Sequence, residues 1–341
     1  MFSRKIPSLL GASLLFAAST LGAALLAGPH NVEASFLSTR DPGLVARAEL
    51  RDVYSDWQRI KTAYKDGYRR VILLDYDGTV VPFHSDPESA TPSATLLSSL
   101  RDLAGSKYNT IWFISGRDKI FLDKWFGNID GLGLSAEHGA LVKEPGKNWV
   151  SLGASLNMAW KSTLQGIMDR YSGRFSNTRT EVKQYSLSWH YRDNPDANYE
   201  ELYNELNSAI KSNGFDVSAM KGNMVVEVKH NKLSKGKIVE DIVSRSYRGE
   251  LHDYEHGGRR AVDFLLLMGD DTSDEQMFKA LRGTDDDELE WSNTFSFWVQ
   301  HENKANKETD AKWRIPGPDG NEWNNPPNLL HHLAEATYSS A

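Results

Sequence analysis

Short runs of consecutive apolar residues recur along the chain, and between them apolar residues return at the spacing of a helix. Such runs are typical of strands that are buried on both faces. They occupy residues 70–74, 110–114, 132–136 and 263–268. Helical spacing predicts helices over residues 49–68, 91–104 and 329–336, and another that begins after Ser234. Buried strands that alternate with helices predict a parallel α/β sheet.

The middle of the chain has a different pattern, in which polar and apolar residues alternate. The alternation covers residues 183–191 and 224–228, with a helix-like segment over 198–213 between them. It is typical of antiparallel strands that leave one sheet face open to solvent. We therefore expect a small α+β domain over residues 142–233, inserted into a core made of residues 50–141 and 234–338.

The N-terminus differs from the rest of the chain. Arg4 and Lys5 precede an uncharged run over residues 6–28 that is rich in Leu and Ala. A basic start followed by such a run predicts a signal peptide over residues 1–34, with cleavage before Ser35 and delivery to the secretory pathway or secretion. The run also has the roughly 20 residues that span a bilayer, so a retained membrane anchor is the alternative.

Composition narrows the function classes. The chain has 341 residues, of which 40% are hydrophobic and 25% charged, and this balance fits a globular enzyme with more than one domain. A formal net charge of −7 argues against a nucleic-acid partner. The absence of cysteine excludes disulfides, thiolate metal ligands and a cysteine nucleophile.

Three of the apolar runs end in polar residues. Residues 70–74 lead into Asp75 and Asp77, residues 110–114 into Ser115-Gly116-Arg117, and residues 263–268 into Gly269-Asp270-Asp271. In open parallel sheets, ligands bind outside the carboxyl ends of the strands. Each ending alone also fits a solvated turn, but three endings at one sheet edge predict a binding site.

The carboxylates in these endings point to a cation. An extended backbone aims Asp75 and Asp77 in the same direction, and Asp270 or Asp271 adds a carboxylate from another strand. Such groups repel one another unless a hard cation lies among them, and Mg²⁺ is the natural occupant. The ligand spacing of an EF-hand calcium loop is absent from the sequence.

The same strand endings also offer groups that bind an anion. Lys235 lies just inside the helix that Ser234 begins, where it can hold a phosphate. The Ser115 hydroxyl and backbone N–H groups near Gly78 and Gly116 can complete the cradle. Together with the carboxylates, this set predicts phosphoryl transfer with a carboxylate nucleophile.

These motifs carry a resemblance to a known family. The sequences D-Y-D-G-T, S-G-R, S-K-G and G-D-D-T-S-D-E resemble, in order, the four motifs of the haloacid dehalogenase superfamily. Over residues 55–335 the chain is similar to trehalose-6-phosphate phosphatases, most specifically in W-H-Y-R at 189–192, with A-E-H-G-A at 136–140 and Glu181-x-Lys183. The resemblance implies a Rossmann-like core with a parallel sheet and an inserted α+β cap that sets substrate specificity.

The resemblance implies roles for the acidic residues. Asp75 is expected to attack phosphorus and form an aspartyl-phosphate, and Asp77 to act as general acid and then general base. Mg²⁺ is expected to bind Asp75, the backbone carbonyl of Asp77, and Asp270. Asp274 is expected to act on this site from behind the direct ligands. Asp270 to Glu275 also fits an acidic helix N-terminus favoured by the helix dipole.

The resemblance also implies a phosphate site at Ser115, Gly116 and Lys235, with Lys235 among the catalytic residues. The expected substrate-binding residues are Arg117, His138, Glu181, Lys183, Arg192 and Glu227. Three alternatives stay open: Arg117 only ties loops together, His138 caps the preceding strand, or the cap charges pair on an ordinary strand surface. Trp189 and His190 are expected to pack in the cap core rather than to form a sugar platform.

Two departures from the family pattern affect these expectations. The family often has a lysine four residues before Glu227, where this chain has Asn223, and nearby Lys221 is a candidate substitute. Ser273 stands where the fourth motif usually has threonine, which keeps the hydroxyl.

Together with the acidic residues, the resemblance thus implies a Mg²⁺-dependent phosphatase that hydrolyses trehalose 6-phosphate in the last step of trehalose biosynthesis. Its partner would be a small sugar phosphate, with membrane association only through the N-terminal segment. The alternatives are another sugar phosphatase of the superfamily, similar to sucrose-phosphatase, and a catalytically silent sugar-phosphate-binding subunit. The presence of both Asp75 and Asp77 argues against the silent subunit.

Overall fold

The computed structural model describes residues 50–84, 87–251, 261–301, 308–319 and 325–338. All of them fall in one compact unit, Ala48–Ala341. The predicted signal peptide or anchor over residues 1–34 lies outside the described residues. Within the described ranges, no helix combines the length and the apolar character needed to cross a membrane.

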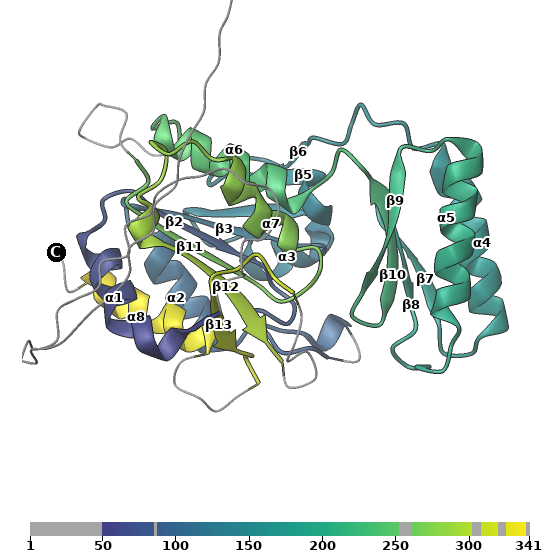
Figure 1. The fold of residues 1–341 in the computed structure, drawn as a ribbon, viewed down its shortest axis with the longest axis horizontal. Helices are drawn as coiled ribbons and strands as arrows, with labels where there is room; N and C mark the ends of the chain where they lie inside the picture. The colour runs from purple at the N-terminus through teal and green to yellow at the C-terminus, as the bar shows by residue number, and fades with distance from the viewer. Residues whose placement is uncertain (1–49, 85–86, 252–260, 302–307, 320–324, 339–341) are drawn as a thin grey trace, which may run out of the picture. The chain divides into compact units, whose positions relative to one another are not determined.

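The described part of the core contains a nine-stranded sheet, ordered β1-β13-β12-β11-β2-β3-β4-β5-β6 (Figure 1). The strands from β1 to β4 in this order pair in parallel, and β5 and β6 pair antiparallel at one edge. The strand bounds are β1 Arg51–Asp52, β2 Arg70–Leu74, β3 Asn109–Ile114, β4 Leu132–Ala136, β5 Leu141–Lys143, β6 Val150–Ser151, β11 Phe264–Gly269, β12 Thr294–Gln300 and β13 Trp313–Pro316. The predicted parallel α/β architecture is confirmed.

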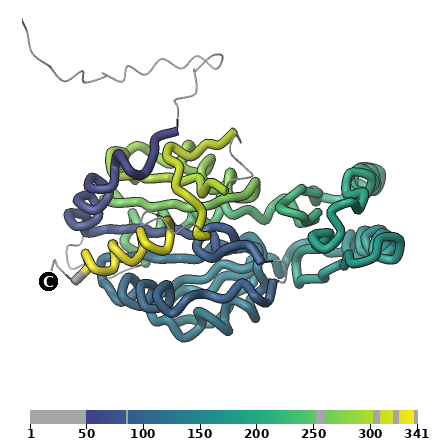
Figure 2. Tube along the Cα trace, turned by 90° about the horizontal axis from the view of Figure 1, so that it is seen from below, coloured from purple at the N-terminus to yellow at the C-terminus, as the bar shows by residue number. Residues whose placement is uncertain are grey.

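Helices cover both faces of this sheet (Figure 1). One face packs against α1 (Val53–Asp66), α2 (Ala94–Ala104), α3 (Lys119–Phe126) and α8 (Pro326–Tyr338), and the other against α6 (Lys235–Tyr247) and α7 (Glu275–Ala280). Strand β2 shows why its sequence is apolar throughout: Ile72 and Leu74 join one core cluster, and Val71 and Leu73 join the other. Figure 2 shows α1 and α8 side by side, although they lie far apart in the sequence.

The inserted segment forms a second, four-stranded antiparallel sheet, ordered β7-β8-β10-β9. Its strands are β7 Arg179–Val182, β8 Ser186–His190, β9 Val217–Gly222 and β10 Val225–His230. Helices α4 (Trp160–Arg174) and α5 (Tyr199–Asn213) cover one face and enclose a separate apolar cluster that includes the buried Trp189. The other face is turned toward the core (Figure 1). We call this layer the cap.

Two details differ from the sequence-based expectations. Residues 142–151, expected at the start of the cap, instead contain β5 and β6, which extend the core sheet. Their polar residues reflect a partly covered sheet edge rather than a change of domain. Residues 183–191, expected as one alternating segment, contain a turn over 183–185 that separates β7 from β8.

Candidate active site

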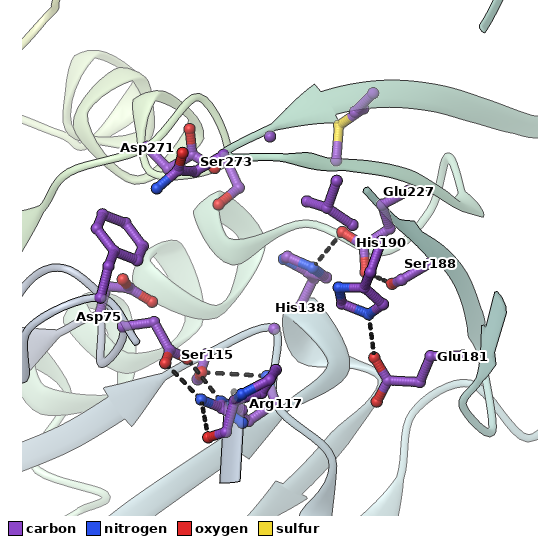
Figure 3. A pocket seen from close by; sticks show the side chains of 18 of the residues that line it. Asp75, Ser115, Arg117, His138, Glu181, Ser188, His190, Glu227, Asp271 and Ser273 are labelled. Atoms are coloured by element: carbon purple, nitrogen blue, oxygen red, sulfur yellow. Dashed lines mark hydrogen bonds and ion pairs between the residues drawn. The ribbon is translucent and has the colours of Figure 1, made fainter. Parts of the chain in front are cut away.

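A pocket of about 450 Å³ lies between the carboxyl ends of the core strands and the open face of the cap sheet (Figure 3). The core contributes the residues that follow β2, β3 and β11, as the sequence predicted, and the start of α6. The cap contributes polar side chains from β7, β8 and β10. All the predicted site residues except the buried Asp274 line this pocket.

Lys235 lies between two carboxylates at the core side of the pocket. Its Nζ donates to Asp75 Oδ1 at 2.6 Å and to Asp274 Oδ1 at 2.7 Å. Ser234 begins α6 by accepting from the Gly236 N–H, so Lys235 is held in the first turn, as predicted. Burial lowers the pKa of Lys235, but Asp274 and Asp75 outweigh it and raise that pKa overall.

Burial disfavours the ionised form of Asp75, and its hydrogen-bond partners only partly offset this cost. Burial and the neighbouring Asp274 raise the pKa of Asp75 well above its ordinary value, despite the opposing effect of Lys235. The carboxylate of Asp75 also accepts from the Thr79 hydroxyl at 3.3 Å. A further positive charge beside Asp75 would favour its ionised, nucleophilic form.

Three buried carboxylates, Asp75, Asp270 and Asp274, place ligand atoms within 4.8 Å of one another. Both carboxylate oxygens of Asp274 already accept hydrogen bonds. Its Oδ2 accepts from the Asp270 and Asp271 N–H groups at 3.0 and 2.9 Å, and its Oδ1 accepts from Lys235. A Cβ at Gly78 would lie 2.8 Å from Asp270 Oδ2, so the loop after β2 approaches Asp270 as closely as a glycine allows. This donor set fits Mg²⁺ at Asp75 and Asp270, with Asp274 orienting the loop.

Asp77 is held by Arg117. The guanidinium donates to both carboxylate oxygens, through Nε at 2.7 Å and Nη2 at 2.6 Å. It also donates to the Pro87 carbonyl at 2.8 Å and lies over the Phe121 ring, 4.1 Å from its centroid. Arg117 therefore ties together the loops after β2 and β3, one of the two roles that the sequence left open.

The loop after β3 is packed closely against His138. The Ser115 hydroxyl accepts from the Arg117 N–H at 3.1 Å, and the Ser115 carbonyl accepts from the His138 N–H at 3.0 Å. A Cβ at Gly116 would lie 2.8 Å from His138 Nε2, so a side chain at this position would displace the imidazole. Ser115 and Gly116 line the pocket together with Asp75, and the Ser115 N–H is already bound to the Ser135 carbonyl at 2.9 Å.

On the cap side, the Glu227 carboxylate has three partners, of which Figure 3 shows His138 and Ser188. Its carboxylate contacts His138 Nε2 at 2.7 Å, the Ser188 hydroxyl at 3.3 Å and Lys183 Nζ at 3.7 Å. Burial opposes ionisation of Glu227, but His138 and Lys183 outweigh it and lower its pKa. Burial also lowers the pKa of His138.

A second imidazole–carboxylate pair lies beside the first. His190 Nε2 is 2.7 Å from Glu181 Oε2, and Lys183 Nζ is 3.9 Å from the same oxygen. Burial acts against ionisation of Glu181, but His190 and Lys183 lower its pKa to about 2. The predicted cluster of Glu181, Lys183 and Glu227 is therefore one connected group.

The structure places Arg192 and Lys221 at contacts that the sequence did not predict. Arg192 donates to the His84 carbonyl, and to the Asn223 carbonyl at 3.3 Å. Lys221 donates to both oxygens of Glu200 at 2.6 Å and lies over the Tyr203 ring. Its ammonium therefore pairs with Glu200 in an exposed ion pair, while Lys221 itself lines the pocket.

Sequence reasoning missed three residues of the site. Ser188 and His190 have the same parity on β8, opposite to the buried Trp189, so the alternation itself was the available signal. His301 follows β12, with Nε2 3.4 Å from Asp270 Oδ2 and its ring against Phe83. No motif marks His301 in the sequence.

Comparisons with known proteins agree with this geometry. The model of the trehalose-phosphatase family matches residues 73–319. The trehalose-phosphatase of Saccharomyces cerevisiae is 35% identical over 273 residues, which is 75% of this chain and 30% of that protein. A trehalose-phosphatase of Schizosaccharomyces pombe is 36% identical over 224 residues, covering 64% and 26% respectively. The chain thus spans less than a third of the length of these curated relatives.

Solved structures give the same assignment. The C-terminal domain of C. albicans trehalose-6-phosphate phosphatase superposes with a TM-score of 0.71 at 32% identity, over 86% of this chain and 99% of that one. Aspergillus fumigatus trehalose-6-phosphate phosphatase gives a TM-score of 0.58 at 29% identity, over 85% and 100%. With the family model matched across most of the sequence, this chain belongs to the trehalose-phosphatase family of the haloacid dehalogenase superfamily.

Proposed function

We propose that this protein is a Mg²⁺-dependent phosphatase that hydrolyses trehalose 6-phosphate to trehalose and inorganic phosphate, the last step of trehalose biosynthesis. One observation carries the proposal. The buried Asp75–Lys235 pair and the polar cap group of Glu181, Lys183 and Glu227 face one pocket from opposite sides. A ligand that uses both needs a phosphate at one end and several hydroxyls at the other, which a disaccharide phosphate provides.

At the core side, Asp75 attacks phosphorus. An oxygen of Asp75 forms a bond to phosphorus while the bond from phosphorus to the sugar oxygen breaks, and Asp77 protonates that leaving oxygen. Water then attacks the phosphorus of the aspartyl-phosphate and gives its proton to Asp77. This second step releases inorganic phosphate and restores the Asp75 carboxylate.

Three groups would hold the phosphate during both steps. Lys235, Ser115 and Gly116 line the pocket together with Asp75, and the Lys235 ammonium contacts the Asp75 carboxylate. Asp75 and Asp270 would hold Mg²⁺ together with the Asp77 carbonyl, while Asp274 keeps the Asp270 loop in place. When bound, the ion would supply positive charge that offsets the repulsion between the phosphate and the carboxylates.

The contact between Asp77 and Arg117 implies a rearrangement during turnover. Both oxygens of Asp77 accept from Arg117, so one of them must be released before Asp77 can give a proton to the leaving oxygen. A substrate that enters between the core and the cap would replace this contact. In the second step the guanidinium can return and orient Asp77 as a base.

At the cap side, the charged groups suit sugar hydroxyls. Ionised Glu227 and Glu181 accept hydrogen bonds, and the Lys183 ammonium between them donates. A substrate that lacks the corresponding hydroxyls would forgo the hydrogen bonds that these groups can add to their existing contacts, each worth about 0.5–1.5 kcal/mol. The cap therefore favours a disaccharide over a small monoester.

A substrate panel tests the proposal. Residues 35–341 would be assayed for phosphate release from trehalose 6-phosphate, sucrose 6-phosphate and glucose 6-phosphate, with and without Mg²⁺, beside a D75N control. We expect trehalose 6-phosphate to be preferred by orders of magnitude and Mg²⁺ to be required. A preference for sucrose 6-phosphate would assign the chain to another sugar phosphatase class, and binding without release would identify a silent subunit.

We also propose that residues 1–34 direct the chain to the secretory pathway and are removed before Ser35. The basic start and the uncharged run over residues 6–28 support this proposal. N-terminal sequencing of the native protein tests it. A mature chain that begins at Ser35 agrees with it, and one that keeps residues 6–28 indicates a membrane anchor.

A further inference from the structure

Charged side chains from two other parts of the chain hold the turn between β7 and β8, residues 183–185. The carboxylate of Glu137 accepts from the Gln184 N–H at 3.1 Å and from the Tyr185 N–H at 2.7 Å. The ammonium of Lys161 donates to the Lys183 carbonyl, and to the Gln184 carbonyl at 3.2 Å. The N–H groups of this short backbone segment therefore bind a carboxylate, and its carbonyl groups bind an ammonium.

Glu137 is held firmly on the core side of these contacts. It follows β4 and is only 2% exposed. Glu137 and His138 both have left-handed backbone conformations, with φ of 47° and 56°. For residues other than glycine, such conformations cost roughly 1–2 kcal/mol each and persist only where the surroundings fix them.

The surroundings that fix this strained pair belong to the predicted phosphate site. The Glu137 N–H donates to the Arg117 carbonyl at 2.9 Å, and the His138 N–H donates to the Ser115 carbonyl at 3.0 Å. The backbone of the loop after β3 therefore sets where the Glu137 carboxylate lies.

The side chain of Lys183 completes a ring of contacts. From the turn that Glu137 holds, Lys183 Nζ reaches back to the Gly116 carbonyl at 3.1 Å. Hydrogen bonds thus connect three segments in a ring: the phosphate loop (residues 115–117), the strained pair Glu137–His138 and the cap turn (residues 183–185). These contacts join the place where phosphate would bind to Lys183 on the cap side of the pocket.

We propose that Glu137 is a positioning residue, which fixes Lys183 of the cap relative to the phosphate loop so that one substrate can engage both. The part of this inference that concerns the sugar rests on the proposed function. A glutamine at position 137 keeps the size of the side chain but offers one acceptor for two backbone donors, and its amide N–H₂ faces one of them. The turn should then loosen while the core remains folded.

The first test needs no substrate. The labelling rate of Lys183 by an amine-reactive reagent would be measured by mass spectrometry in the wild type and in E137Q, with Lys235 as an internal reference. We expect Lys183 to react about tenfold faster in E137Q, because the backbone contacts that hold it are weakened, and Lys235 to be unchanged. E144Q is the matched control, since Glu144 pairs with Lys147 and Arg245 outside the site.

A folded E137Q protein in which Lys183 labels at the wild-type rate would overturn the proposal. Faster labelling of Lys183 and Lys235 alike would also overturn it, because that result indicates a general support of the fold. If E137Q does not fold, K161Q provides a second variant. It removes the contacts of the half-buried Lys161 on α4 with the carbonyls of the same turn, and the same criteria apply to Lys183 in K161Q.

Kinetics separate positioning from simple support. For E137Q we expect the KM for trehalose 6-phosphate to rise about tenfold, with kcat/KM for p-nitrophenyl phosphate within about twofold of wild type. K183A should show a similar loss, and the double variant should be no worse than K183A, because both changes act on one contact. Losses that multiply would contradict the proposal.

A wild type that hydrolyses only p-nitrophenyl phosphate would instead defeat the proposed function, while the labelling test would still decide the role of Glu137.

Discussion

Lys235 Nζ lies 2.6 Å from Asp75 Oδ1, and the two residues come from strand and helix ends far apart in the sequence. Both are buried, and Lys235 also holds Asp274. The ammonium thus balances two carboxylates that would otherwise repel each other. This arrangement predicts that Lys235 is needed both for the stability of the core and for the proposed reaction.

Replacing Lys235 should therefore have two effects. Without Mg²⁺, K235Q should lower the free energy of unfolding by about 3–5 kcal/mol, because it leaves two buried carboxylates uncompensated. Under saturating Mg²⁺, it should lower kcat by about 10²-fold or more through loss of charge beside the phosphate. Urea unfolding and phosphate-release assays measure the two. K237Q on the exposed side of the same helix should change neither, and an active, fully stable K235Q would disprove the assignment.

The acidic group should respond to the metal itself. Mg²⁺ at about 100 times its dissociation constant should stabilise the wild type by about 2.7 kcal/mol, because the ion binds only the folded site. D270N should lose most of this stabilisation, whereas E240Q, which changes an exposed carboxylate on α6, should keep it. Thermal unfolding with and without Mg²⁺ provides the comparison. Equal stabilisation of wild type and D270N would place the ion elsewhere.

Glu227 should govern substrate choice and leave the chemical step intact. E227Q removes a charge that His138, Ser188 and Lys183 share, so kcat/KM for trehalose 6-phosphate should fall about 10- to 100-fold. Turnover of p-nitrophenyl phosphate, which does not reach the cap, should stay near wild type. E201Q serves as control, because Glu201 is an exposed cap carboxylate that pairs with Arg174 outside the pocket. Equal losses on both substrates would show that Glu227 acts on the core instead.

The pKa of Glu181 predicts a pH-dependent contribution to stability. His190 and Lys183 hold this pKa at about 2, below its ordinary 4.5, although burial acts in the other direction. The folded state therefore binds this proton less tightly than the unfolded state does. The resulting stabilisation is fully present above the unfolded pKa and is lost as the pH falls from about 4.5 toward about 2.

Comparing E181Q with the wild type isolates this contribution. E181Q should be less stable than the wild type at about pH 6, and the difference in the free energy of unfolding should shrink steadily toward about pH 3. Urea unfolding across this range measures it. A difference that stays constant with pH would show that the ion pairs of Glu181 do not stabilise the fold.

Much of the candidate site could be predicted because the apolar pattern of a strand shows where the strand ends and which residues follow it. Strand β2 must be apolar on both faces, and its carboxyl end then delivers Asp75 and Asp77 to the sheet edge. The position of Lys235 followed from the Ser234 cap. Such signals lie within a few residues of the group that they place.

Features fixed by distant contacts could not be predicted in the same way. The turn over residues 183–185 has no glycine or proline, and Glu137 and Lys161 hold it from elsewhere in the chain. The pairing of Arg117 with Asp77 depends on how two loops meet. His301 lies near Asp270 only because β12 pairs with β11. In each case tertiary packing, and not a local pattern, decides the position.

The most direct test of the account is the covalent state of Asp75 during turnover. Protein mixed with trehalose 6-phosphate and Mg²⁺, quenched rapidly in acid and digested, would be analysed by mass spectrometry, beside D75N treated in the same way. The account predicts one added phosphoryl group on the peptide that contains Asp75, and none in D75N. Steady phosphate release without any phosphorylated Asp75, or release by D75N at the wild-type rate, would contradict it.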